Sequence, residues 1–128
     1  MPEHVTRPTK LELSILRALW QSGGGTVREI HAIVNGVKPT GPTTVLKMLQ
    51  IMAEKGLVVR DGSVRPQVYR ARHPQEHTQK HLLADLLHRA FGGSVKALVM
   101  QALSTEKPSR KDMETIEKLL DKYEGESK

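Results

Sequence analysis

The most informative stretch of the sequence runs from Thr26 to Gly56 and reads TVREIHAIVNGVKPTGPTTVLKMLQIMAEKG. Apolar residues recur at helical spacing in its first third and again in its second half, and a loop rich in proline and glycine separates the two parts. We therefore predict a short helix over residues 26–36 and a longer helix over residues 43–55. Gly56 is well placed to end the second helix, because glycine adopts the left-handed conformation that often follows a last helical turn.

The residues on either side extend this pattern. At three places a hydroxyl residue precedes an acid by three positions, a spacing that is typical of the first turn of a helix. The three pairs are Thr9–Glu12, Thr26–Glu29 and Ser109–Asp112. The first pair predicts a helix of about 12 residues, which the glycine run at 23–25 ends.

After Gly56 the spacing of the apolar residues changes from helical to strand-like. Residues 57–60 predict a strand, residues 61–63 a turn and residues 67–70 a returning strand. Because Pro66 is unfavourable in a central strand, we expect the hairpin to be a short edge ribbon. Three helices followed by a hairpin is the element order of a winged helix-turn-helix.

From Pro74 onward the sequence is helical again, in three segments with wide apolar stripes. About 50 residues of this kind can hardly close a core alone, so we expect the stripes to pack against a second copy of the chain. The alternative is that this arm packs back on its own winged helix. The residues predicted to form the dimer are Leu82, Leu83, Leu86, Leu87, Phe91, Val95, Leu98, Val99, Leu103, Ile116, Leu119, Leu120 and Tyr123.

The predicted fold is thus mainly α with a small β-hairpin. It consists of a winged helix-turn-helix DNA-binding domain in residues 1–74 and a helical dimerisation domain in residues 75–128. Residues 1–74 hold 11 Lys and Arg against 5 Asp and Glu, whereas residues 75–128 hold 9 of each, so the net charge of +6 belongs to the first domain. A basic module joined to a neutral one is typical of a protein that binds a polyanion such as DNA, although a basic surface can also serve solubility alone.

Other classes of function lack their sequence signatures. The absence of cysteine excludes disulfides, thiolate nucleophiles and cysteine-based zinc or copper sites. No apolar run approaches the ~18 residues that span a bilayer, and residues 1–10 hold no apolar signal-peptide core, so we expect a soluble cytoplasmic protein. There is no glycine-rich phosphate loop, no HExxH motif and no Gly-x-Ser-x-Gly elbow, so we predict neither enzymatic activity nor a cofactor.

The helix predicted over residues 43–55, which we call the recognition helix, has two unlike faces, as a helix that enters the major groove of double-stranded DNA requires. The apolar residues predicted to dock inward are Val45, Leu46, Leu49, Met52 and Ala53. The polar residues predicted to contact bases are Thr43, Thr44, Lys47 and, furthest along the helix, Gln50. The alternative for Thr43 and Thr44 is that they merely cap the helix.

Phosphate contacts supply affinity and orientation rather than sequence choice. The helix before the recognition helix is expected to cross the phosphate backbone, with Thr26 and Arg28 at its start as candidates. Further candidates are Lys10, Arg60 and, at the hairpin tip, Arg65. The alternative for arginines on the strands is that they are solvated residues that protect a sheet edge.

Several segments occur in a familiar order and spacing. They are Thr9–Leu13 with Trp20, Thr26–Ile30, Thr43–Leu46, Glu54–Val58, Val68–Arg70 and Phe91–Ser94. Together they resemble the penicillinase-repressor and methicillin-resistance-regulator family over about residues 8–122. The resemblance implies a winged-helix homodimer that occupies a pseudo-palindromic operator and represses transcription, possible targets being β-lactam-response or related genes.

The resemblance also implies a partner. Some family members are induced by a membrane sensor protease that cuts the dimerisation region, at an Asn-Phe bond after a run like Leu-Val-Leu. This chain has LVMQA at residues 98–102 instead. Lys47 and Ile51 stand where the family often has Thr and Arg, so we expect a different operator preference. The copper-responsive branch uses cysteines near the C-terminus, which this chain lacks.

Two alternatives belong to other classes of function. His77, His81 and His88 share one predicted helical face, and the first two are candidate ligands in a metal-responsive regulator, or titrating groups in a pH-responsive one. The other alternative is a non-enzymatic protein–protein adaptor, which the basic first domain argues against.

Overall fold

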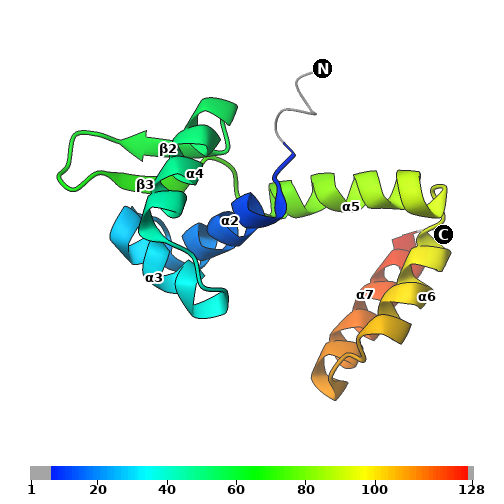
Figure 1. Ribbon diagram of the computed structural model, residues 1–128. Coiled ribbons are helices and arrows are strands. Elements are labelled where there is room, and N and C mark those ends of the chain that lie inside the picture. Colours follow the sequence, from blue (N-terminus) through cyan, green and yellow to red (C-terminus); the bar gives the residue numbers. More distant parts are fainter. Residues whose placement is uncertain (1–6, 127–128) are drawn as a thin grey trace. The chain divides into compact units, whose positions relative to one another are not determined.

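The computed structural model describes residues 7–126, which form two compact units divided between Leu82 and Leu83, within one helix (Figure 1). The structure is mainly α with a small antiparallel sheet, as predicted. Its helices and strands are α2 (Lys10–Ser22), β1 (Gly25–Thr26), α3 (Val27–Val37), α4 (Pro42–Lys55), β2 (Val58–Asp61), β3 (Val68–Ala71), α5 (Gln75–Phe91), α6 (Val95–Thr105) and α7 (Arg110–Glu126).

Both predicted capping boxes in the first unit are complete. The hydroxyl of Thr9 accepts a hydrogen bond from the amide of Glu12 at 3.2 Å, and the Glu12 carboxylate accepts one from the Thr9 amide at 2.8 Å. Thr26 and Glu29 form the same reciprocal pair. These bonds satisfy donors that the start of a helix leaves open, so α2 and α3 begin where the sequence predicts.

The predicted glycine ends of the helices are confirmed for α4 but not for α3. α4 ends at Gly56, whose φ of 81° is the left-handed conformation that the sequence predicts there. The prediction that α3 ends at Gly36 is wrong by one residue. The helix includes Val37, because the amide of Lys38 still donates to the carbonyl of Val34 at 3.1 Å.

The sheet has three antiparallel strands in the order β1-β3-β2, so the prediction of a two-stranded edge ribbon is wrong. β3 is the central strand, and Pro66 does not interrupt it because the strand begins two residues later. The added strand β1 pairs Gly25 with Tyr69. The preceding Gly24 has φ 115°, and a Cβ there would lie 3.0 Å from the Tyr69 carbonyl oxygen. The glycine run therefore permits a close approach of two backbones as well as ending α2.

The core of the first unit lies between α2, α3, α4 and the sheet. Trp20 lies partly buried against it, and its indole N–H donates to the carbonyl of His73 at 3.0 Å. Buried apolar residues come from every one of these helices and from β2 and β3. They are Ile15, Leu16, Ala18, Leu19, Ile30, Val34, Val45, Leu49, Met52, Leu57, Val58 and Tyr69.

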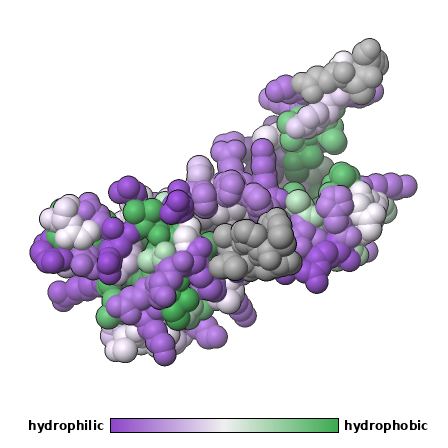
Figure 2. Space-filling view, turned by 90° about the horizontal axis from the view of Figure 1, so that it is seen from above, coloured by the Kyte–Doolittle hydropathy of each residue, from purple (hydrophilic) through white to green (hydrophobic). Residues whose placement is uncertain are grey.

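The second unit has no comparable core. No residue between Gln75 and Gly125 is buried. Green apolar surface is visible among purple hydrophilic side chains at the right of Figure 2. Large apolar side chains exposed in α5, α6 and α7 are Leu83, Leu86, Val95, Val99, Met100, Leu103, Leu119, Leu120 and Tyr123. No described helix is long and apolar enough to cross a membrane.

Candidate nucleic-acid interface

The first turn of α4 presents polar groups to solvent. Its N-cap is Gly41, which offers no side-chain cap, and Pro42 follows at the first helical position. The alternative role of Thr43 and Thr44 as capping residues is therefore wrong. Both side chains are exposed, and neither hydroxyl makes a hydrogen bond with a residue that the structure describes. Two threonine hydroxyls and the open amides of a helix start are thus free to meet a ligand.

The rest of α4 divides into the two predicted faces. Val45, Leu49 and Met52 are fully buried and anchor the helix in the core. Lys47 and Gln50 are exposed, on the same side as the first-turn threonines by helical spacing. A helix anchored along one side and polar along the other has the form that major-groove recognition needs.

Leu46 departs from its predicted place. Its side chain is 39% exposed, so the prediction that it docks inward is wrong. It lies instead in a groove of about 570 Å³ between the start of α3, the start of α4 and the hairpin. The residues that line this groove are Thr26, Val27, Arg28, His31, Pro42, Leu46, Pro66, Gln67 and Tyr69.

The groove brings two predicted phosphate contacts beside the start of α4. The hydroxyl of Thr26 accepts a hydrogen bond in its capping box, and its O–H can still donate to a ligand. Arg28 is exposed two residues later, in the first turn of α3, and no described acid forms an ion pair with it. Arg28 is therefore the stronger phosphate ligand of the two, because it carries a full charge and several donors.

The hairpin carries the other two arginines of the predicted set. Arg60 is exposed on β2, and Arg65 is exposed near the tip, where its guanidinium donates to the carbonyl of Gly62 at 3.4 Å. Asp61 lies between them in sequence. Hydrogen bonds from the hydroxyl and the amide of Ser63 and the charge of Arg70 hold the pKa of Asp61 below its ordinary value, so the turn carries an anion at neutral pH.

A family model described as penicillinase repressor matches residues 8–122. The chain belongs to the penicillinase repressor family. The protein called transcriptional regulator BlaI of Mycobacterium tuberculosis is 30% identical over 87 residues, in strain CDC 1551 / Oshkosh and likewise in strain ATCC 25618 / H37Rv. That match covers 67% of this chain and 63% of the relative, so less than two thirds of the relative's length is matched. The family is one of transcriptional regulators and not of enzymes.

In this member of the penicillinase repressor family, an ion pair fixes the far end of α4. The Lys55 ammonium lies 2.8 Å from the carboxylate of Glu12 in α2, whose side chain is fully buried. Burial raises the pKa of Glu12, but the hydrogen bonds from Lys55 and Thr9 and the Lys55 charge lower it more, so the net pKa is below its ordinary value. Glu12 is therefore ionised at neutral pH and ties the two helices together.

The structure separates Lys10 from the other predicted contacts. Lys10 does not line the groove but a different pocket, between α2 and α3. Sequence reasoning also missed several residues of the groove itself, chiefly His31, Pro66, Gln67 and Tyr69. The sequence predicts the hairpin but not which helix ends lie close to it, so these residues could not be assigned to the groove.

The histidines form a row at the start of α5. The rings of His73 and His77 stack with centroids 4.3 Å apart, and His77 and His81 follow at 4.5 Å. Burial lowers the pKa of His73, and the charges of His77, Arg72 and His81 lower it further. Among the residues that the structure describes, no three His, Cys, Asp or Glu side chains are grouped as metal ligands. The rings of His73 and His77 are stacked, and those of His77 and His81 are tilted by 45°.

Proposed function

We propose that this chain is a sequence-specific repressor that binds a pseudo-palindromic operator as a homodimer, and that its targets are β-lactam-response or related genes. The observation that carries the proposal is the uncapped, exposed first turn of α4 beside the groove that Arg28 lines. Membership of a repressor family supplies the biological context.

The recognition helix supplies the proposed base contacts. The major groove, about 12 Å wide, admits an α-helix, and recognition helices contact base edges from their first turns. Thr43 and Thr44 can donate hydroxyls or pack on thymine methyl groups, Lys47 can donate to guanine, and Gln50 can pair with adenine. All four side chains are exposed.

The proposed phosphate contacts surround that helix. Arg28 and Thr26 would meet the backbone from the start of α3, and Arg60 and Arg65 from the hairpin. We leave Lys10 out of this set, because it lines the pocket between α2 and α3. We assign DNA binding to residues 1–74 and dimerisation to residues 75–128.

We propose that a second copy of the chain packs against the exposed apolar side chains of the arm. Tyr123 and Val95 are 59% and 62% exposed, and the other large apolar side chains of the arm are exposed to a similar degree. Large apolar side chains exposed in such number are typical of an interaction surface. A two-fold dimer would also present two recognition helices to two half-sites.

The DNA test begins with footprinting of the chain's own upstream region at two salt concentrations. We expect a two-fold symmetric protected site and binding that weakens steeply with salt. Arg28→Ala should weaken binding to all sequences alike and reduce the salt slope by about 0.9, whereas Lys47→Ala should change sequence preference. Lys96→Ala, at an exposed position in α6, is the control. No protection at low salt, or uniform coating, would refute operator binding.

The dimer test uses analytical ultracentrifugation of two variants. Leu86→Asp and Leu119→Asp each place a charge on an exposed apolar position and should shift the chain from dimer to monomer. Ser104→Asp, on an exposed polar position of α6, should leave the dimer intact. A dimer that survives both leucine substitutions would show that the arm is not the interface.

The inducing partner proposed from the family is a membrane sensor protease. In this chain residues 98–102 stand where some family members have the cleaved segment. They lie inside α6, where Gln101 and Ala102 are exposed. Cutting there would separate α7 from the rest of the arm. Mass spectrometry of the chain from cells exposed to a β-lactam tests this, since an intact chain during derepression would rule out cleavage.

A further inference from the structure

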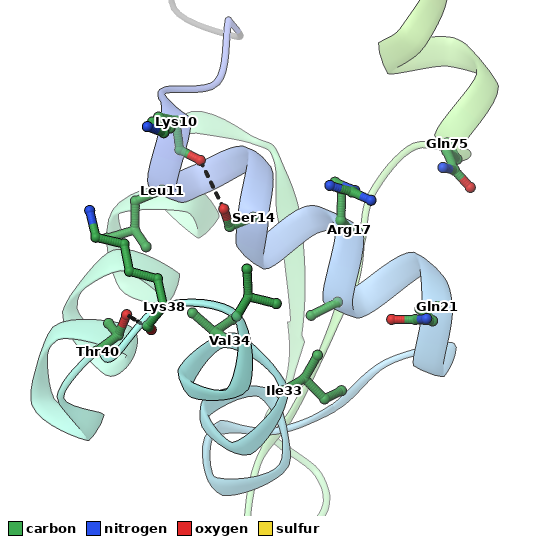
Figure 3. Close-up of a pocket in the computed structure, with 12 residues that line it drawn as sticks. Lys10, Leu11, Ser14, Arg17, Gln21, Ile33, Val34, Lys38, Thr40 and Gln75 are labelled. Atoms are coloured by element: carbon green, nitrogen blue, oxygen red, sulfur yellow. Dashed lines mark hydrogen bonds between the residues drawn. The ribbon is translucent and has the colours of Figure 1, made fainter. Parts of the chain in front are cut away.

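The first unit holds a second concave site that DNA recognition does not use. It is a pocket of about 420 Å³ between α2 and α3. In Figure 3 the side chains of Val34 and Ile33 lie towards the middle, with Lys10, Leu11 and Lys38 on one side and Arg17 and Gln21 on the other. Its lining residues are Lys10, Leu11, Ser14, Arg17, Ala18, Gln21, Ile33, Val34, Val37, Lys38, Thr40 and Gln75.

The pocket combines an apolar wall with a positive rim. Lys10, Arg17 and Lys38 line it, and no described acid does. Neither ion pair between described side chains involves these three cations. Val37 adds an apolar side chain to the rim that is 84% exposed.

The wall formed by residues 38–40 is held in place by hydrogen bonds. The Thr40 carbonyl lies 2.7 Å from Nε2 of His31, and the Thr40 amide donates to Oδ1 of Asn35 at 2.9 Å. The Thr40 hydroxyl donates to the carbonyl of Lys38 at 2.8 Å. A pocket with a fixed wall loses little conformational entropy when a ligand enters it.

We propose that this pocket binds a small organic anion with an apolar body, such as a carboxylate on an aromatic ring or a short alkyl chain. Its volume lies within the ordinary range of small-molecule sites, about 300–1,000 Å³. The apolar wall would take the body of the ligand, and the cations at the two ends of the pocket would attract the charge of its carboxylate. The site goes beyond the proposed operator binding. It adjoins the loop that leads to Gly41, the N-cap of α4, so an occupant would lie next to the start of the recognition helix.

The test titrates the full chain, labelled with ¹⁵N, with sodium 1-naphthoate and separately with neutral 1-naphthylmethanol. We expect naphthoate to shift the amides of residues 10–21 and 33–40 and to bind several-fold more tightly than the alcohol. Arg17→Gln and Lys38→Gln should each weaken naphthoate binding about 1.5- to 5-fold, the range of an exposed ion pair. Val37→Glu should weaken it at least as much, because it adds a like charge to the apolar rim.

Two controls separate this site from other anion-binding or apolar surfaces. Lys96→Gln removes an exposed cation from the arm, and Arg28→Gln removes the cation of the other groove, so neither should change naphthoate affinity. Equal affinity for naphthoate and naphthylmethanol would overturn the proposal. Shifts that gather in the arm or around Arg28, or affinity unchanged in the Arg17 and Lys38 variants, would also overturn it.

Discussion

Replacing Glu12 by alanine is expected to lower the free energy of unfolding by about 3–4 kcal/mol. Removing one partner of a buried ion pair costs about 3–5 kcal/mol, because the other charge stays behind without compensation. Lys55 is 29% exposed and can regain some water, which favours the lower end of that range. The lost hydrogen bond to the Thr9 amide adds about 1 kcal/mol.

The same contact should make stability depend on pH in the acid range. The folded pKa of Glu12 is lowered, so its contribution to stability is fully present above the ordinary glutamate pKa. It is lost as the pH falls through the lowered folded value, because the folded state must then take up a proton on a carboxylate that it prefers ionised. The difference in unfolding free energy between wild type and Glu12→Gln should therefore shrink at acid pH.

The assay is urea unfolding followed by the fluorescence of Trp20, the single tryptophan, at one fixed protein concentration. Glu12→Gln keeps the shape of the side chain and should cost less than Glu12→Ala. Glu54→Ala is the matched control, since Glu54 is exposed in α4 and its loss should cost no more than about 0.5 kcal/mol. A loss below about 1 kcal/mol in Glu12→Ala would refute the assigned role of the pair.

Thermal unfolding should check three further substitutions. Gly24→Ala should destabilise the chain by about 1–3 kcal/mol, because φ is 115° there and the new Cβ would lie 3.0 Å from the Tyr69 carbonyl oxygen; an unchanged midpoint would contradict this. Gly36→Ala, in a helix with open space around the site, should instead stabilise it by about 0.5–1 kcal/mol, and a loss of stability would count against the helical assignment there. Trp20→Phe should cost about 1 kcal/mol through the hydrogen bond to His73, and a neutral result would show that bond to be dispensable.

Most of the buried and exposed positions of the recognition helix could be predicted from the sequence. Its helical period correctly placed Val45, Leu49 and Met52 inward and Lys47 outward, because a helix buries one side along a fixed repeat. Leu46 lies at the edge of the apolar stripe, where the period alone does not decide. The open groove between the start of α3 and the hairpin leaves it exposed.

The order of the helices, the starts of α2 and α3 and the glycine end of α4 could be predicted from local sequence, because caps and periodicity act over three or four residues. The pairing of β1 with β3, the contact of Glu12 with Lys55 and the separation of Lys10 from the groove that Arg28 lines depend on the tertiary structure. Each of these features depends on how segments that lie far apart along the chain are arranged in space. Such partners are selected by packing and by the approach of backbones, and no local spacing records them.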